Sequence, residues 1–302
     1  MIYGYSKIDS VSIAFGVAPR INACGRMGFS YKALDLLLEK DTNKAIELTD
    51  EIRGFNLKRQ QLERNIFEEA ELKIKKEKLD KEDSIIIGGN NWHSGVIGIV
   101  SSKITEIYGK PSILVCFEDE KDIGKGSGRS IPGFDLHDAL MKCKDILCGF
   151  GGHSMAVGVS VKKDEFENFK KRFLEIAKQA NLSEYVPELN IDQILNVEDI
   201  NMQMVQSLSM LEPFGEANKM PIFAFKGLKI DSIRSLSDGK HLKLTLKSEN
   251  NIYINAIGFN LGNLASDFVI GDKVDVAGSL EINSFNGVQS IQINLKDVMK
   301  SL

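Results

Sequence analysis

The sequence is poor in residues arranged to hold metal ions. Its 302 residues include four cysteines and four histidines, none of them adjacent to another of its kind. Cys143 and Cys148 are too far apart for a Cys-x-x-Cys pair, and no Asp-x-Asp motif or His-rich cluster is present. The sequence therefore predicts neither a zinc site nor a two-metal hydrolytic centre within it. Scattered free thiols are typical of a cytoplasmic protein, which is the localisation we expect.

The sequence also lacks long apolar runs and an excess of basic residues. No stretch approaches the length of a membrane-spanning helix and no signal-peptide pattern opens the sequence, so we expect no membrane partner. The formal net charge of −4 argues against a surface coated with basic residues. It does not exclude nucleic acid, because a few arginines can hold phosphates on an otherwise acidic surface.

Apolar residues make up 43% of the sequence, which is enough for two hydrophobic cores. Their steps of three and four predict one long connecting helix from about Tyr31 to Leu79, with Arg59 interrupting the apolar stripe. The next segment alternates strand and helix patterns, which predicts an α/β domain that begins with a parallel βαβ unit. The predicted strands lie at 84–88, 111–117 and 157–161, with a glycine-rich turn or strand at 125–131. A loop followed by a helix is predicted at 92–108, and further helices at 135–146 and 164–179.

The pattern changes after Asn181. A short helix at 201–211 is followed by several short strands, which predict a small β-barrel. These strands are expected at 222–225, 228–232, 241–247, 252–259, 273–282 and 289–295. The expected fold class is therefore α/β plus β. We expect an interdomain segment with the long helix at 1–79, an α/β domain with a mostly parallel or mixed sheet at 80–187, and the barrel at 188–302. Because the sequence opens in mid-pattern, we expect it to be part of a longer protein.

The strongest local signal is a glycine-rich run with one histidine, Gly-Phe-Gly-Gly-His-Ser-Met-Ala-Val-Gly at 149–158. Glycines let backbone amides approach a ligand closely. A histidine among them can donate to a phosphate or support proton transfer. A tight turn with a solvent-exposed His153 fits the same residues, so the pattern alone leaves both interpretations open.

A second run, Gly-Lys-Gly-Ser-Gly-Arg-Ser at 124–130, places a hydroxyl and a guanidinium between glycines. Arginine presents a rigid fork to phosphate oxygens, and serine adds a short donor. A plain glycine-rich hairpin is the alternative, and the run matches neither a P-loop nor a dinucleotide fingerprint.

Two further places could contact an anion. Arg20 and Arg26 could line an anion site, or they could equally cap the start of a helix. His93 and Ser94 precede an expected helix, and a helix N-terminus can bind an anion. Trp92 beside them is expected to be a packing residue.

Taken together and in this order, the motifs resemble RecJ-type single-strand-specific exonucleases of the DHH phosphoesterase superfamily. The run at 151–158 is similar to the signature of the DHHA1 domain, and those at 19–28, 92–100 and 126–130 are similar to RecJ exonucleases in particular. The run at 211–223 resembles the entry to that family's OB-fold, and 283–297 resembles its end. The resemblance covers essentially the whole chain and implies a DHHA1 domain followed by an OB-fold barrel.

The resemblance also implies roles for individual residues. His153 would lie near the scissile phosphate and donate to an oxygen where charge develops. His93 and Ser94 would be further substrate contacts. The residues implied to bind substrate phosphate are Ser127, Arg129, Arg26, Arg20, Gly151 and Gly152. In such enzymes an N-terminal domain with an Asp-His-His motif holds manganese or magnesium. That motif is absent from this sequence, so we expect none of these ions to be bound by this chain's own ligands.

The function implied is the substrate-binding half of a 5′-to-3′ single-stranded DNA exonuclease of DNA repair and recombination, inactive without the metal domain. One alternative is a DHH-family phosphodiesterase of short oligonucleotides or cyclic dinucleotides. Those relatives generally end after the DHHA1 domain, so the barrel favours the exonuclease. Another alternative is a non-catalytic module that binds single-stranded nucleic acid. The implied partner is single-stranded DNA, with a single-strand-binding protein added by family analogy alone.

Overall fold

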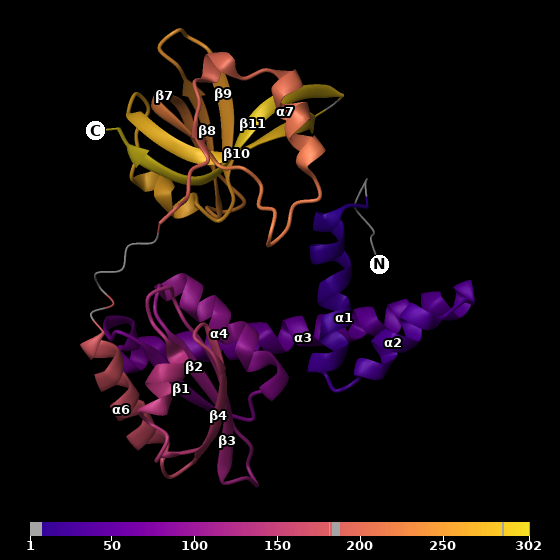
Figure 1. Cartoon of the computed structure of the whole chain (residues 1–302), viewed down its shortest axis with the longest axis vertical. Coiled ribbons are helices and arrows are strands. Elements are labelled where there is room, and N and C mark those ends of the chain that lie inside the picture. Colours follow the sequence, from indigo (N-terminus) through magenta and orange to yellow (C-terminus); the bar gives the residue numbers. More distant parts are fainter. Residues whose placement is uncertain (1–7, 181, 183–187, 286, 302) are drawn as a thin grey trace. The chain divides into compact units, whose positions relative to one another are not determined.

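The computed structural model describes residues 8–180, 182, 188–285 and 287–301. They belong to two compact units, one within residues 1–187 and one within residues 188–302 (Figure 1). The finer division between a helical segment and an α/β domain at residue 79 stays a prediction.

The first unit begins with helices. They are a π-helical turn (Ser12–Val17), α1 (Ala18–Arg26), α2 (Ser30–Leu38) and α3 (Thr42–Glu77). The prediction of one helix from Tyr31 was therefore wrong, because the chain breaks after α2. Asp41 ends the break as the N-cap of α3, and its carboxylate accepts a hydrogen bond from the backbone N–H of Lys44 at 3.0 Å.

A five-stranded sheet follows the long helix. Its strands are β1 (Ile85–Asn90), β2 (Ser112–Phe117), β3 (Ile123–Arg129), β4 (Leu147–His153) and β5 (Ala156–Lys162). The strand order is β1-β2-β3-β5-β4. Only β1 and β2 are parallel, and the other pairs are antiparallel. The expected βαβ unit and the mixed sheet are thus both confirmed.

Helices cover both faces of this sheet. They are α4 (Ser94–Tyr108), α5 (Leu136–Met141) and α6 (Phe166–Gln179). One core lies between the sheet and α5 and α6, around Phe169 and Phe173. The other lies between the sheet and α3 and α4, around Ile97 and Ile104. Because α3 contributes to this second core, the long helix is fixed to the α/β fold.

A tight turn was one of the two interpretations left open for the glycine-rich run, and most of the run is strand instead. Gly149 to His153 form the second half of β4 and pair with β5, so the turn consists of Ser154 and Met155 alone. Carbonyl groups of both turn residues accept hydrogen bonds, from the N–H of Leu136 and of Ser130. Antiparallel pairing therefore overrides the turn propensity of the glycines, and the hairpin is held at its tip.

The second unit is a β-barrel of the OB type. Its elements are β6 (Gln193–Ile194), α7 (Met202–Leu208), β7 (Phe223–Leu236), β8 (His241–Lys247), β9 (Tyr253–Gly258), β10 (Lys273–Phe285) and β11 (Val288–Lys300). The sheet closes because β10 pairs with both β11 and β7. Its core is aliphatic with Phe225 fully buried, which confirms the predicted small barrel.

One detail of the barrel differs from the prediction. The two strands expected at 222–225 and 228–232 are a single strand, β7, with Lys226 and Gly227 bulged opposite Asp275. The Asp275 carboxylate accepts hydrogen bonds from the N–H of Gly227 at 2.9 Å and the hydroxyl of Ser301 at 2.6 Å. The bulge therefore stays in the ladder because a carboxylate satisfies its free amide.

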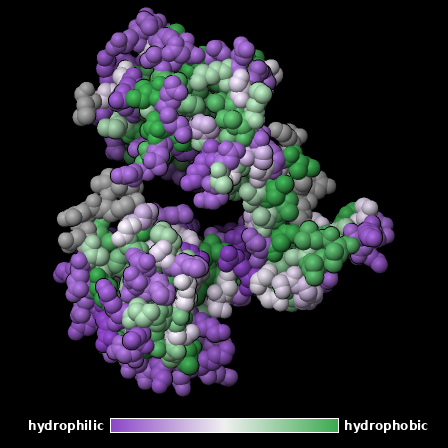
Figure 2. All heavy atoms as spheres, viewed as in Figure 1, coloured by the Kyte–Doolittle hydropathy of each residue, from purple (hydrophilic) through white to green (hydrophobic). Residues whose placement is uncertain are grey.

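Large apolar side chains are exposed on the N-terminal helices. Figure 2 shows hydrophobic residues gathered there. The most exposed are Phe15, Leu34, Leu37 and Leu38, each with more than half of its surface open to solvent. An apolar patch of this kind usually marks a surface that another part of a protein covers.

Among the described residues, no helix is long and apolar enough to cross a membrane.

We predict that Asp275→Ala destabilises the barrel by about 1–3 kcal/mol at neutral pH, because the bulge amide loses a charged acceptor. The bonds from Ser301 and Gly227 lower the pKa of Asp275. A depressed carboxyl pKa stabilises the fold above the unfolded value and ceases to do so as the pH falls through the folded value.

Urea unfolding of wild type and variant should therefore differ at neutral pH and converge in acid. Asp231→Ala is the control, because Asp231 is exposed and makes no hydrogen bond to the described residues. An equal effect of both substitutions would contradict the role of Asp275.

Candidate functional site

Ser127 and Arg129 lie side by side on one face of β3. They alternate with Gly124, Gly126 and Gly128, which face the core under α5 and α6. A Cβ at Gly126 would lie 2.5 Å from Val159. The glycines of this run are thus explained by packing, while the serine and the arginine project toward α4.

The Arg129 guanidinium is a cation without a counter-charge. Its Nη1 donates to the Ser127 hydroxyl at 3.2 Å and to the Gly128 carbonyl at 2.8 Å. No carboxylate among the described residues forms an ion pair with it. Burial lowers the pKa of Arg129, and the nearby positive charge of Arg26 lowers it further. An anion placed here would relieve both the lost hydration and the repulsion between the two cations.

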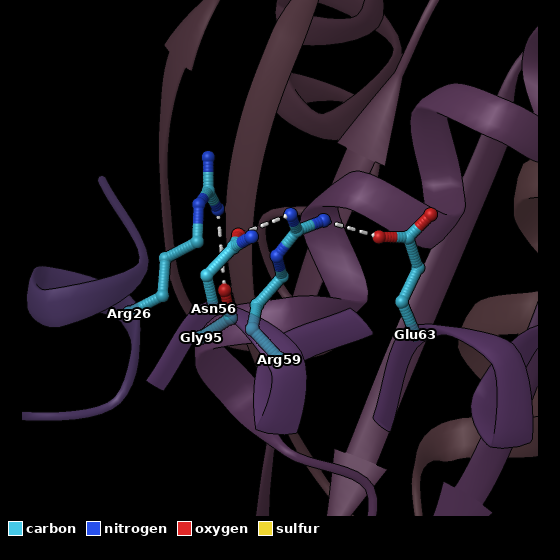
Figure 3. Close-up of polar contacts among 5 residues, drawn as sticks. All are labelled: Arg26, Asn56, Arg59, Glu63 and Gly95. Carbon is cyan, nitrogen blue, oxygen red and sulfur yellow. Dashed lines mark hydrogen bonds and ion pairs between the residues drawn. The ribbon is translucent and has the colours of Figure 1, made fainter. Parts of the chain in front are cut away.

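Arg26 reaches this site from the C-terminus of α1. Its Nη1 donates to the carbonyl oxygen of Gly95 in the first turn of α4 at 3.2 Å, as Figure 3 shows. Arg20 is not brought to the same place by any recorded contact. Its guanidinium donates to the carbonyl of Gly16 instead, and six helical residues separate the two side chains by about 120° around α1.

The N-terminus of α4 satisfies most of its own amides. His93 is the N-cap, and its Nδ1 accepts a hydrogen bond from the N–H of Gly95 at 3.1 Å. Its carbonyl accepts from Val96 and Ile97. These amides are therefore not free for an anion, whereas Nε2 of His93 carries a hydrogen that can be donated. Ser94 is exposed, and its hydroxyl makes no hydrogen bond to the described residues.

Trp92 fixes the loop before α4. Its indole N–H donates to Glu69 at 2.8 Å, and Lys73 lies over the ring and bonds to Glu69 and to the Gly88 carbonyl. A Cβ at Gly89 would overlap the indole. Trp92 therefore ties the loop to α3 and β1 as a packing residue.

Arg59 of α3 explains the interruption in the apolar stripe. Its guanidinium donates to Asn56 at 2.7 Å and to Glu63 at 2.5 Å, all on the same helix (Figure 3). Its charge is thus compensated, in contrast to that of Arg129.

His153 lies in register with Arg129 across the sheet. Arg129 pairs with Ala156 of β5, and Ala156 pairs with His153 of β4, so all three share one face. Two strand spacings separate His153 from Arg129 by roughly 9–10 Å. The exposed imidazole is therefore aligned with the phosphate-binding candidates without touching them.

The sheet surface between Arg129 and His153 is open and carries only small residues. Ser127 pairs with Gly158, which pairs with Gly151. A Cβ at Gly149 or Gly151 would meet nothing within 4 Å, and one at Gly158 only a carbonyl at 4.0 Å. Gly152 differs, because its conformation requires glycine. Its φ is +135°, and an added Cβ would lie 2.3 Å from the Ala156 carbonyl oxygen. We name the surface formed by Gly149, Gly151, Ala156 and Gly158 the glycine floor.

The barrel presents a second candidate surface on β8 and β9. Lys247 lies 5.3 Å from the ring of Tyr253, and His241 packs against Phe259 at 5.4 Å. Both aromatic rings are about half exposed, and Lys243 is exposed between them. Cations next to exposed rings on a barrel face are suited to the backbone and bases of a single strand.

Nowhere in the described part of the chain do three or more His, Cys, Asp or Glu side chains come together to hold a metal ion. Manganese or magnesium therefore has no fitting set of ligands among these residues.

Sequence reasoning missed several residues of the site. Gly95 and Gly98 of α4 contact Arg26, Ser127 and Arg129, and Gly158 forms part of the glycine floor. Two glycines three apart in an otherwise apolar helix were the signal for the first pair. Gly158 closes the glycine-rich run at 149–158, but no role in the site was predicted for it.

Two family models match the chain. The DHHA1 domain matches residues 82–179, and the RecJ OB domain matches residues 191–297. The first match contains the sheet with Ser127, Arg129 and His153, and the second contains the barrel.

Individual proteins are similar to the chain over nearly its whole length. The chain is 34% identical to the single-stranded-DNA-specific exonuclease RecJ of Bacillus subtilis, over 98% of this chain and 38% of that protein. The crystal structure of RecJ in complex with Mg²⁺ from Thermus thermophilus superposes with a TM-score of 0.82 at 30% identity, over 97% of this chain and 44% of that one. A structure of exonuclease RecJ bound to manganese gives a TM-score of 0.54 at 33% identity, over 61% and 45%. The chain thus spans less than half the length of these relatives.

We predict that Arg129→Met leaves the free energy of unfolding within about 1 kcal/mol of wild type or raises it, because an apolar chain of similar length removes a desolvated cation. Urea unfolding measures this. Lys125→Met, an exposed change on the same strand and face, is the control and should be neutral. Loss of more than about 2 kcal/mol in Arg129→Met would mean that Arg129 serves the fold rather than a ligand.

Proposed function

This chain is RecJ-like, with a DHHA1 domain followed by a RecJ OB domain, and we propose that it binds the substrate of a 5′-to-3′ single-stranded DNA exonuclease. The observation that carries the proposal is the uncompensated charge of Arg129 beside Arg26 and the Ser127 hydroxyl. The relatives named as RecJ are single-stranded-DNA-specific exonucleases, and the proposal extends that specificity to this chain.

The ligand of this cluster would be the 5′-terminal phosphate. A terminal phosphate carries a charge between −1.5 and −2 at neutral pH and offers three acceptor oxygens. A phosphodiester inside a strand carries a single charge. Two guanidinium groups and a hydroxyl therefore favour the end of the strand over its interior. His93, through its free Nε2 hydrogen, and the exposed Ser94 are further donors at this end of α4.

The strand would continue from the phosphate across the glycine floor to His153. Because the glycine floor carries no side chain larger than the methyl group of Ala156, a sugar and phosphate can lie against the strand backbone. Gly151 and Gly152 would then contact phosphate through their backbone. His153, two strands from Arg129, would donate to an oxygen of the scissile phosphate as negative charge develops there.

The metal ions of the reaction would be held by another part of the longer protein. The compared RecJ structures are described with Mg²⁺ or Mn²⁺, and the described residues of this chain offer no fitting ligands. The exposed apolar side chains of the π-helical turn and α2 mark the surface where we infer that this other part packs. By itself the chain would therefore bind DNA without cleaving it.

A second candidate function is a non-catalytic module that binds single strands through the barrel. The cationic and aromatic surface of β8 and β9 favours such binding. In the exonuclease this surface would likewise bind single-stranded substrate. The alternative of a phosphodiesterase for short oligonucleotides does not account for the barrel.

The proposal is tested by Arg129→Ala in this chain. We expect weaker binding of a 5′-phosphorylated strand by about 1.5–3 kcal/mol, or 10- to 150-fold, because a hydrogen-bonded charge is removed. Fluorescence anisotropy measures the affinity, with the 5′-hydroxyl strand and Lys125→Ala as controls. Unchanged affinity for the phosphorylated strand would refute the role of Arg129.

His153→Ala is tested in the longer protein. We expect cleavage to slow by about a hundredfold, as for loss of one donor to a developing charge, with affinity for the strand nearly unchanged. Single-turnover rates and anisotropy separate the two effects. Met155→Ala in the same hairpin is the control. Equal loss of rate and affinity would make His153 a binding group only.

A further inference from the structure

Helix α4 has a glycine where the phosphate-binding candidates contact it. A Cβ added at Gly98 would lie 2.9 Å from the Ser127 hydroxyl oxygen and 3.3 Å from Nη2 of Arg129. Both distances are shorter than ordinary van der Waals contacts. The hydroxyl and the guanidinium therefore rest on the helix backbone at this point, one turn into α4.

Folding of the helix gives no reason for this glycine. Gly98 lies inside α4 and its φ is not positive. A glycine inside a helix is less favourable than alanine by roughly 0.5–1 kcal/mol. The atoms it would meet are the ends of two polar side chains, not backbone or core. What the missing side chain does allow is the close approach of Ser127 and Arg129 to the helix.

Two other helical glycines provide a comparison. At Gly54 of α3 an added Cβ would meet nothing within 4 Å. At Gly95 it would lie 2.3 Å from the backbone carbonyl of Arg26, so that α1 itself would have to move. The effect of an added Cβ at Gly98 is intermediate, because only the ends of the Ser127 and Arg129 side chains would have to move.

We propose that Gly98 is a positioning residue for the 5′-phosphate site, and this inference rests on the function proposed above. Because Gly98 has no side chain, its backbone determines how far the Ser127 hydroxyl and the Arg129 guanidinium extend from β3 toward α4. The Nη1 of Arg129 bonds to that hydroxyl, so both groups must move together if either is displaced. A methyl group at position 98 would turn them away from a shared phosphate while the helix stays intact.

The test compares Gly98→Ala with Gly54→Ala in this chain. The quantity measured by anisotropy is the ratio of dissociation constants for the same strand with a 5′-hydroxyl and with a 5′-phosphate. We expect Gly98→Ala to reduce this ratio about tenfold, as for a small misplacement of a binding group. Gly54→Ala should keep the wild-type ratio. The melting temperatures of both variants should equal or exceed that of wild type, because alanine favours the helix.

A double variant shows whether Gly98 acts through Arg129. In the Arg129→Ala background, Gly98→Ala should change the ratio by less than it does in wild type, because only the Ser127 hydroxyl is left to be displaced. An additive effect of the two substitutions would overturn the inference.

The remaining outcomes separate the two proposals. A wild-type ratio of one would refute the 5′-phosphate function itself. A wild-type preference for the phosphate that Gly98→Ala leaves unchanged would overturn only the inference on Gly98. Unfolding of Gly98→Ala would also overturn it, because Gly98 would then be a packing residue.

Discussion

The partly buried charge of Arg129 is the constraint on which the site depends. Its pKa is lowered first by burial and then by Arg26, and no carboxylate among the described residues compensates it. Arg59 of the same unit, by contrast, is paired with Glu63. A protein tolerates an unpaired, desolvated cation when a ligand supplies the missing anion. The other residues of the site position that cation for its ligand.

The fold supplies this support through two kinds of contact. Antiparallel register places Arg129, Ala156 and His153 in one row across three strands. Helix α4 contacts the C-terminus of α1, which carries Arg26. At Gly98, where α4 has no side chain, the same helix contacts Arg129. Helix α3 packs against the same face of the sheet and holds α4 in place. The long helix is thus part of the site's support, although it provides none of the proposed ligand contacts.

Local pattern was sufficient to predict the buried elements. The apolar stripe of α4 and the aliphatic runs of β1 and β2 have strong periodicity, and they were found where expected. The local pattern did not predict the structure where contacts between residues distant in the sequence determine it. The residue pattern left a tight turn open for Gly149 to His153 because glycine favours turns, yet pairing with β5 makes them a strand. The alignment of His153 with Arg129 and the separation of Arg20 from Arg26 depend on tertiary structure and on helical phase. The roles of the site residues stay predictions.

We infer above all that this chain contains a binding site for the 5′-phosphate end of a single strand. The most direct test is to titrate the chain with one DNA strand that carries its terminal phosphate at the 5′ end or, in a second sample, at the 3′ end. The two strands have the same sequence and net charge, so general electrostatic attraction is equal for both. We predict clearly tighter binding of the 5′-phosphorylated strand. Equal affinity for the two strands would contradict it.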